Sequence, residues 1–359
     1  MIILTLLSIT ILILINLLLI FSLMRLNIGS KKERNEVNIS IVIAAKNEEE
    51  NINELIDHLR NLDYSPEMYE VILVDDCSTD DTLSKMKEQT ETINNFSILS
   101  TKTQCASGKR EALSLGIHNS KYPFIIITDA DCRPEKSWLN SYSRKFGQGY
   151  EMLFGIAPFY QHKMLVNKVS CFENLRSSIL SFSMASIGLP YTAAARNFGF
   201  SKNAFESLGG YLKTKDTTSG DDDLLLREAV KNKIKIGVVT EPGSFVYSET
   251  KKTFSEYFQQ KARHTQTSFH YLKKHQLFLG LWHYLNLAFI FSPLLMVINP
   301  LFGILLPAKL LTDVSVVKSN QKKFSYDFSI VEVIYLQIIY ELLLIVHFLN
   351  ARFTEIKWK

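Results

Sequence analysis

The chain has 359 residues and a formal net charge of +4, so it can hold one large domain with additional elements and gives no reason to expect a nucleic-acid partner. Its cysteines form no C-x-x-C pair, so the sequence predicts neither a zinc site nor a disulfide framework. We expect free thiols at all of them: Cys77, Cys105, Cys132 and Cys171.

The first segment, residues 2–24, carries no charge and consists almost entirely of apolar or small polar residues. A helix needs about 20 such residues to cross the hydrocarbon core of a membrane. A cleavable signal peptide is the alternative, but its apolar region is usually shorter and is preceded by basic residues, which are absent here. Arg25, Lys31 and Arg34 follow instead, which favours the cytoplasm for the next residues. We therefore expect an uncleaved anchor over residues 1–26.

The middle of the chain alternates between short apolar runs and helical patterns. Four runs are typical of buried strands: residues 40–45, 71–74, 96–99 and 124–127. Apolar residues at helical spacing follow the first run, Ser78 and Asp81 fit a capping box after the second, and Gly108 precedes a further helix. Such alternation predicts an α/β fold with a mainly parallel central sheet, whose ligands bind at the carboxyl ends of the strands.

Polar residues follow three of the four predicted strands, at the edge of the sheet where ligands are expected. They are Asn47 and Glu48, Asp75 and Asp76, and Asp129 and Asp131. Asp129 and Asp131 stand at i and i+2 on an extended segment, so both carboxylates lie on one side of the backbone. Oxygen ligands of this kind suit Mg²⁺ or Mn²⁺, which share their remaining positions with phosphates. The alternative is a solvated acidic turn.

The run from Ser40 to Asp131 resembles the family-2 glycosyltransferases, which are inverting enzymes with the GT-A fold. The resemblance rests on three motifs in order: Ala45-Lys46-Asn47-Glu48, Val74-Asp75-Asp76-Cys77-Ser78-Thr79-Asp80 and Asp129-Ala130-Asp131. It continues to about residue 270 through Leu208-Gly209-Gly210-Tyr211 and Gly220-Asp221-Asp222-Asp223-Leu224. It implies a nucleotide-sugar donor, without naming the sugar, and a divalent metal on Asp131 and Asp129.

The resemblance also implies the residues of the reaction. The family's catalytic base is the Asp of an E-D pair. Alignment on Asp223-Leu224 assigns this role to Asp221. Asp222 is the alternative, because Gly220 stands where the family has Glu. Donor-binding residues are implied at Ala45, Asn47, Glu48, Asp75, Asp76, Lys109, Asp129 and Arg263. A solvated helix lysine is the other interpretation of Lys109, and a structural ion pair is that of Arg263.

A further motif, Gln260-Lys261-Ala262-Arg263-His264, resembles the Q-x-x-R-W of membrane synthases, with His264 in place of Trp. We expect Gln260 and His264 near the acceptor or product. The replacement of Trp argues against processive synthesis, because the family's Trp packs at the acceptor terminus.

The last third of the chain returns to apolar sequence. Residues 277–311 contain one charge, Lys309, and are too long for a single straight crossing, so a hairpin broken at Asn299-Pro300 is expected. A single kinked span is the alternative. Residues 330–349 predict another span, although they carry two acids. We expect two or three spans over residues 277–350.

The sequence therefore predicts an integral protein of the plasma (inner) membrane with a cytoplasmic GT-A domain over residues 38–275. The resemblance implies inverting transfer of a hexosyl or N-acetylhexosaminyl group from a nucleotide diphosphate sugar, with uridine as the expected base. The expected acceptor is lipid-linked, membrane-embedded or a growing glycan. Membrane lipids are its expected surroundings. The alternatives are a processive polysaccharide synthase and a non-catalytic membrane protein that binds a nucleotide sugar.

Overall fold

The computed structural model describes residues 2–26, 36–101, 108–214 and 220–353 of the chain. These residues form two compact units that are interleaved along the sequence. The helical unit takes its described residues from 1–29, 158–191 and 250–359, and the sheet unit takes them from 30–157 and 192–249. The chain thus passes through the helical unit at 158–191, inside the range predicted for the catalytic domain.

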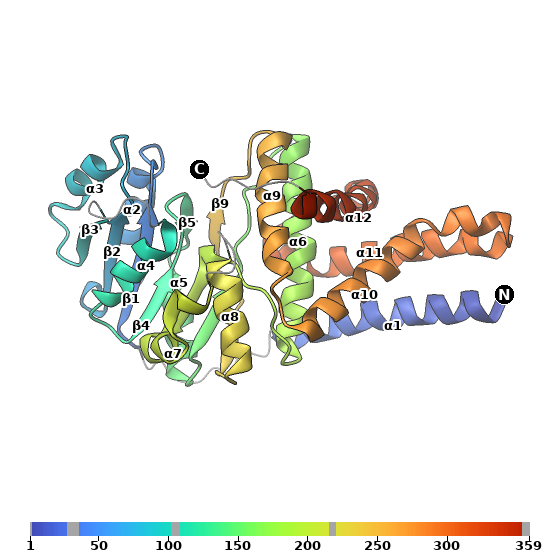
Figure 1. Ribbon diagram of the computed structural model, residues 1–359, viewed down its shortest axis with the longest axis horizontal. Coiled ribbons are helices and arrows are strands. Elements are labelled where there is room, and N and C mark those ends of the chain that lie inside the picture. The colour runs from blue at the N-terminus through green and yellow to red at the C-terminus, as the bar shows by residue number, and fades with distance from the viewer. Residues whose placement is uncertain (1, 27–35, 102–107, 215–219, 354–359) are drawn as a thin grey trace. The chain divides into compact units, whose positions relative to one another are not determined.

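Among the described residues of the sheet unit, seven strands form one sheet in the order β3-β2-β1-β4-β7-β6-β8 (Figure 1). Strand β1 is parallel to both β2 and β4, β2 is parallel to β3, and β6 is parallel to β8, whereas β7 is antiparallel to β4 and β6. The predicted mainly parallel sheet is confirmed. The bounds are β1 Ile39–Ala45, β2 Tyr69–Asp75, β3 Phe96–Ser100, β4 Phe124–Ile127, β6 Met152–Gly155, β7 Phe198–Ser201 and β8 Ile236–Val239. A separate antiparallel pair consists of β5 Cys132–Pro134 and β9 Val246–Ser248.

Helices cover both faces of this sheet. Ile41 and Ile43 of β1 share a core with Leu55 of α2, while Val42 of the same strand points to the opposite face. There α4 can approach closely because Gly116 has no Cβ. A Cβ at this position would lie 2.4 Å from Val42 Cγ1. The helices of this unit are α2 Ile52–Arg60, α3 Thr82–Thr90, α4 Lys109–His118, α5 Trp138–Gly147, α7 Lys202–Ser207 and α8 Asp221–Lys231, with 3₁₀ turns η1 Pro66–Met68, η2 Ala195–Asn197 and η3 Gly210–Thr214.

The capping box predicted from Ser78 and Asp81 is wrong. Helix α3 begins after Asp81, whose side chain makes no capping hydrogen bond. Asp80 accepts the hydrogen bond from the amide of Thr82 instead, at 3.0 Å, because its side chain lies closer to the first turn. The Ser78 hydroxyl is engaged elsewhere and accepts a hydrogen bond from the amide of Asn47.

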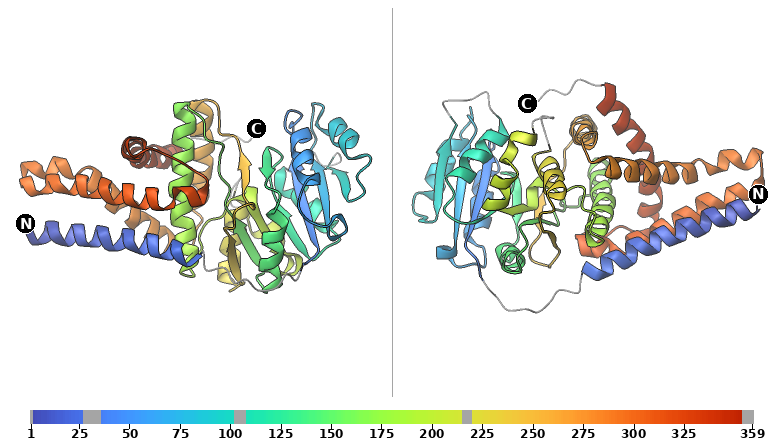
Figure 2. Two further views of the ribbon diagram at one scale, coloured as in Figure 1. Left: turned by 180° about the vertical axis from the view of Figure 1, so that it is seen from behind. Right: turned by 60° about the horizontal axis from the view of Figure 1, so that its bottom comes forward.

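The helical unit contains long helices that lie side by side in Figures 1 and 2, with α1 packed against α11. Its elements are α1 Ile2–Leu26, α6 Leu165–Ser186, α9 Phe254–Ser268, α10 Lys273–Ile290, η4 Ser292–Val297, η5 Pro300–Ile304, α11 Leu305–Asn320, η6 Gln321–Phe324 and α12 Ile330–Phe353. The regular helix stops between α10 and α11, where Asn299 and Pro300 follow η4. Pro300 favours such a break because its amide cannot donate to the preceding turn.

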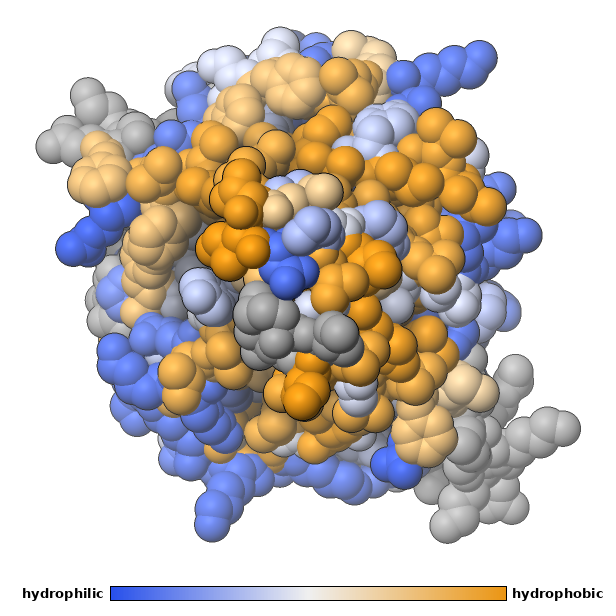
Figure 3. All heavy atoms as spheres, turned by 90° about the vertical axis from the view of Figure 1, so that its right-hand side faces the viewer, coloured by the Kyte–Doolittle hydropathy of each residue, from blue (hydrophilic) through white to orange (hydrophobic). Residues whose placement is uncertain are grey.

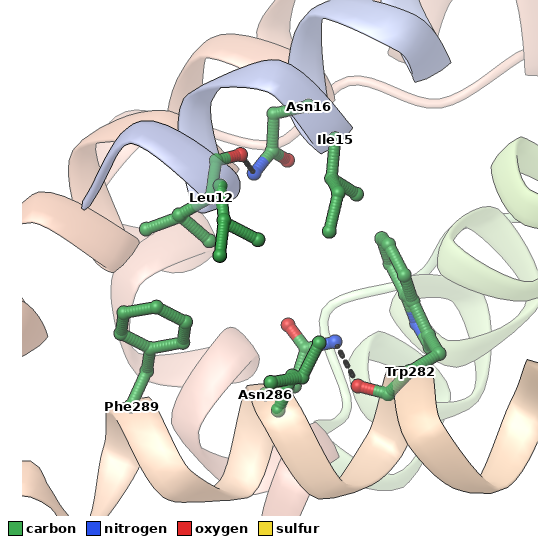
Figure 4. A pocket seen from close by; sticks show the side chains of 8 residues that line it. Leu12, Ile15, Asn16, Trp282, Asn286 and Phe289 are labelled. Carbon is green, nitrogen blue, oxygen red and sulfur yellow. Dashed lines mark hydrogen bonds between the residues drawn. The ribbon is translucent and has the colours of Figure 1, made fainter. Parts of the chain in front are cut away.

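Within the described ranges, three helical segments are long and apolar enough to cross a membrane: Thr5–Leu26, Pro300–Phe324 and Ile330–Phe353. Figure 3 shows apolar side chains gathered on the face where the free end of α1 lies in Figure 1. A small pocket lies between α1 and α10, where Leu12 faces Phe289, Ile15 lies nearer Trp282, and Asn16 and Asn286 add polar atoms (Figure 4).

Buried charges tie the helices of this unit together. Lys309 of α11 is fully buried, and its ammonium lies 2.7 Å from Asp313 and 3.4 Å from Glu341 of α12. Arg176 of α6 lies 3.3 Å from Asp313. Charges in an apolar surrounding are costly unless they are paired, and here two cations face two anions. The acid at 341 therefore faces the protein interior.

Candidate active site

The carboxyl ends of β1 and β2 meet at one edge of the sheet, where their following loops are joined by hydrogen bonds. Ala45 pairs with Asp75 in the register of the two strands, and the amide of Asp76 donates to the carbonyl of Ala45. Asn47 accepts a hydrogen bond of 2.9 Å from the amide of Thr79. The first two polar clusters predicted from the sequence thus lie together.

Asp75 and Asp76 are both buried, with different partners. Asp75 accepts hydrogen bonds from the amide of Ser78 and the hydroxyl of Ser100, so its carboxylate holds the turn after β2. Asp76 accepts one from the hydroxyl of Thr101 at 3.0 Å.

The backbone in these two loops is unusual. Asn47 has φ 56° and Cys77 has φ 58°, the left-handed region that residues with a side chain rarely adopt.

Cys77 is disulfide-bonded, which corrects the expectation of a free thiol there, whereas Cys132 and Cys171 are free as expected. Cys105 lies outside the described residues.

Asp129 and Asp131 follow β4 and are half-buried. Together with Cys132 they offer ligand atoms that all lie within 4.8 Å of one another. Burial, reinforced by both carboxylates, raises the pKa of the Cys132 thiol well above its usual range, so Cys132 is a poor ligand near neutral pH. The remaining donor set, two carboxylates at a half-open position, fits Mg²⁺ or Mn²⁺ with room for phosphate and water oxygens.

Lys109 connects this pair to the predicted base. Its ammonium lies 2.6 Å from Asp129 Oδ1 and 3.7 Å from Asp221 Oδ2. Burial lowers the pKa of Lys109, but the two carboxylates outweigh it and raise the pKa well above its usual value. Lys109 is the first residue of α4, after Gly108 at φ 82°, a conformation that favours glycine. Its interpretation as a solvated helix lysine is therefore wrong.

The three adjacent aspartates begin α8 and point to different partners. Asp222 accepts a hydrogen bond from the amide of Ala195 at 2.6 Å, and Asp223 accepts one from the hydroxyl of Thr192 at 2.7 Å. Asp221 faces Lys109 instead. Burial and the neighbouring charges of Asp223 and Asp221 raise the pKa of Asp222 well above its usual value.

Gly220 stands where the family motif has Glu, and the structure supplies a reason. It precedes α8 with φ 83° and ψ 33°, a left-handed conformation that favours glycine. A Glu at this position would meet backbone strain.

The sequence does not predict that Arg196 supports the site through hydrogen bonds. Its carbonyl accepts a hydrogen bond from Thr128, directly before Asp129, and its guanidinium donates to the carbonyl of Ala157 and to Ser248. Arg196 therefore joins the loop held by Asp222 to the end of β4. No local sequence signal marks it, because it follows three alanines in a generic segment.

The remaining predicted residues, Gln260, Arg263 and His264, belong to α9 of the helical unit. The helix starts with a capping box of Thr253 and Glu256. The roles assigned to these three residues at the donor and acceptor stay predictions.

Comparisons with known proteins agree with this fold. The sequence model described as glycosyl transferase family group 2 matches residues 124–346, and that of glycosyl transferase family 2 matches residues 40–206. Because the first match spans more than half of the chain, the chain belongs to the family-2 group of glycosyltransferases. Its fold is GT-A.

The chain is similar to two curated relatives over about a third of its length. Beta-monoglucosyldiacylglycerol synthase of Nostoc sp. is 30% identical over 125 residues, which are 35% of this chain and 24% of that protein. A dolichyl N-acetyl-alpha-D-glucosaminyl phosphate 3-beta-D-2,3-diacetamido-2,3-dideoxy-beta-D-glucuronosyltransferase of Methanococcus voltae is 35% identical over 103 residues, 29% of this chain and 32% of that protein. The match thus spans between about a quarter and a third of these relatives.

Among solved structures, a mannosyltransferase of Pyrobaculum calidifontis, determined in complex with GDP-Man and Mn²⁺, has a TM-score of 0.55 to this chain. The sequence identity is 16%, and the comparison covers 95% of both chains. This likeness concerns the fold.

Proposed function

We propose that the protein is a membrane-bound, metal-dependent inverting glycosyltransferase that transfers a sugar from a nucleotide diphosphate sugar to a lipid-linked acceptor. The observation that carries the proposal is the line of charges Asp129, Lys109 and Asp221, which joins the Asp129–Asp131 carboxylate pair to a second, buried carboxylate. Such a pairing suits a reaction in which an anion leaves on one side and an acceptor hydroxyl loses a proton on the other.

The proposed donor site lies at the carboxyl ends of β1, β2 and β4. Asp129 and Asp131 would hold Mg²⁺ or Mn²⁺, which when bound stabilises the charge that develops on the departing nucleoside diphosphate. Asp76 is positioned by Thr101 to accept hydrogen bonds from the nucleoside, while Asp75 keeps the turn in shape. Asn47 and Glu48 belong to the adjoining loop and are proposed to contact the same part of the donor.

Asp221 is proposed as the general base. It would accept the proton of the acceptor hydroxyl while that oxygen attacks the anomeric carbon from the side opposite the leaving diphosphate. One new bond forms as the bond to the diphosphate breaks, and the configuration at the anomeric carbon inverts. Asp222 and Asp223 are unsuited to this role because hydrogen bonds to the 192–195 loop already occupy them.

A lipid-linked acceptor is supported by the three helical segments that could span a membrane and by the names of two relatives, a glucosyldiacylglycerol synthase and a transferase acting on a dolichyl-linked sugar. The nucleotide base is proposed as uridine. The sheet unit is proposed to face the cytoplasm at the plasma (inner) membrane, because cytosolic enzymes make nucleotide sugars and Arg25 follows the first apolar segment.

The test uses the full chain purified in detergent, a panel of radiolabelled UDP- and GDP-sugars, and a membrane lipid extract as the acceptor source. We expect one labelled sugar to move into the organic phase in the presence of Mn²⁺ and to stay in the aqueous phase with Asp221→Asn. A surface variant, Asp57→Asn, serves as the control, because Asp57 is exposed on α2 and forms an exposed ion pair with Arg60 at 3.0 Å. Absence of transfer from every donor would contradict the proposal.

A further inference from the structure

The ammonium of Lys109 holds a carboxylate that the proposed reaction needs for another cation. It lies 2.6 Å from Asp129 Oδ1, an oxygen of the proposed metal-binding pair, and 3.7 Å from Asp221 Oδ2, an oxygen of the proposed base. The three side chains are 26%, 29% and 10% exposed, so solvent screens their charges only in part. The inference below rests on the function proposed above.

The contact to Asp129 is a short charge-assisted hydrogen bond of 2.6 Å. A divalent cation that binds Asp129 would meet a positive charge on the same carboxylate, at less than 3 Å from one of its oxygens. Two cations that share one carboxylate repel each other, and the repulsion is stronger in a partly desolvated site than in water. Binding of the metal and retention of the Lys109 contact are therefore competing states of Asp129.

Release of Lys109 from Asp129 needs a new anion for its charge. Asp221 alone is a poor replacement, because an ion pair with the proposed base would oppose its reaction with a proton. The diphosphate of the donor is the other anion that the proposed reaction brings to this edge of the sheet. The lysine side chain can follow it, since Lys109 has a flexible four-carbon stem and stands at the first position of α4.

We propose that Lys109 is a competing cation, which holds Asp129 before the donor arrives and makes binding of the metal and of the donor diphosphate cooperative. Metal alone binds weakly, because it must displace Lys109. Metal together with a nucleoside diphosphate binds tightly, because Lys109 exchanges one anionic partner for another. The device favours metal capture only when a donor is present.

The experiment measures Mn²⁺ binding by electron paramagnetic resonance, with the full chain in detergent, first without nucleotide and then with UDP or GDP, whichever the wild type binds. We expect Lys109→Met to bind Mn²⁺ alone about tenfold more tightly than the wild type and to lose most of the gain that the nucleotide gives. Lys109→Arg keeps the positive charge and should bind Mn²⁺ alone as weakly as the wild type. Lys109→Gln carries the same expectation as Lys109→Met if the latter fails to fold.

Lys202→Met is the matched control, because Lys202 belongs to the same unit and its ammonium donates to the carbonyls of His118 and Ser120. It should leave Mn²⁺ affinity unchanged. If neutral variants at 109 bind Mn²⁺ alone no more tightly than the wild type, while Asp131→Ala abolishes Mn²⁺ binding, the competing-cation role is overturned and the proposed function stands. A wild type that binds no Mn²⁺ with either nucleotide overturns both.

Discussion

Asp222 accepts a hydrogen bond of 2.6 Å from the backbone amide of Ala195, which lies 27 residues earlier in the chain. This contact fixes the direction of the Asp222 carboxylate, which therefore holds the loop that contains Ala195. Asp221, its neighbour on the first turn of α8, points elsewhere, because successive side chains on a helix diverge by about 100°.

The first prediction follows from this difference. Asp221→Asn should reduce sugar transfer at least about 100-fold, the lower end for loss of a general base, while nucleotide affinity stays close to that of the wild type. Asp222→Asn should retain substantial transfer, because Asn still accepts the hydrogen bond from Ala195 and the raised pKa of Asp222 already favours an uncharged side chain. Turnover and UDP binding, measured for both variants, separate the two residues. Near-normal turnover in Asp221→Asn would move the base to Asp222.

The second prediction concerns the metal. Asp131→Ala should abolish transfer and remove the dependence of UDP binding on Mn²⁺, because Asp131 contributes one of the two carboxylates of the proposed site. Calorimetric titration of UDP with and without Mn²⁺ provides the measurement. Asp57→Ala, on the exposed side of α2, is the control and should behave like the wild type. A variant at 131 that keeps its Mn²⁺-dependent affinity would refute the metal role of this residue.

The third prediction concerns the buried amide that supports the site. Asn197 is fully buried, and its Oδ1 accepts hydrogen bonds from Trp138 at 2.8 Å and Tyr142 at 2.7 Å. Asn197→Ala leaves those donors without this acceptor and should cost at least about 2 kcal/mol of unfolding free energy. Urea unfolding followed by tryptophan fluorescence measures the loss. Asn119→Ala, at the exposed end of α4, should change stability far less, and equal effects of the two would argue against the buried network.

The fourth prediction concerns pH. Burial raises the pKa of Glu173, but Lys261, His347 and Tyr257 outweigh it and lower the pKa to about 2, from an ordinary value of 4.5. A carboxylate with a lowered pKa in the folded state stabilises that state above pH 4.5, and its contribution is lost as the pH falls toward 2.

Glu173→Gln should therefore lower the unfolding temperature near neutral pH, and the difference from the wild type should shrink between pH 4.5 and about pH 2. Thermal unfolding across this range in a stable detergent is the measurement. A difference that stays constant as the pH falls would mean that the variant acts through packing and not through the charge of Glu173.

The fifth prediction concerns orientation in the membrane. In a background without the native cysteines, Glu36→Cys should resist an impermeant thiol reagent in intact cells and react after permeabilisation, because residue 36 follows the predicted cytoplasmic basic segment. Val297→Cys, which replaces a 91% exposed residue between α10 and α11, should react in intact cells if these helices form the expected hairpin. Labelling of position 36 and protection of position 297 in intact cells would contradict the proposed topology.

Local sequence signals were sufficient for the part of the fold that carries the site. The apolar runs at β1, β2 and β4 are continuous because both faces of these strands are covered, and such runs are visible without knowledge of the fold. Parallel pairing then brings their polar ends together, so the positions of Asp75, Asp129 and their neighbours follow. The three aspartates also suit the start of α8, since acids are favourable in the first turn of a helix.

The rest depends on contacts between distant residues. The strands β6, β7 and β8 are four residues each and lack a pattern long enough to mark them. The predicted capping box of Ser78 and Asp81 is replaced by a hydrogen bond from the amide of Thr82 to Asp80, which depends on the path of the turn. The different partners of Asp221 and Asp222 are Lys109 and Ala195, which lie far from them in sequence. A local pattern therefore does not show which of the aspartates is available as a base.

The interleaved course of the chain has a consequence for synthesis and for engineering. The sheet unit needs residues up to 249, so it cannot be completed while α6 is the last helix to have left the ribosome. No single cut separates the two units. A fragment that ends at residue 275 would keep Glu173 and Lys261 but lose His347 of α12, so α6 and α9 would lose a helix that packs against both.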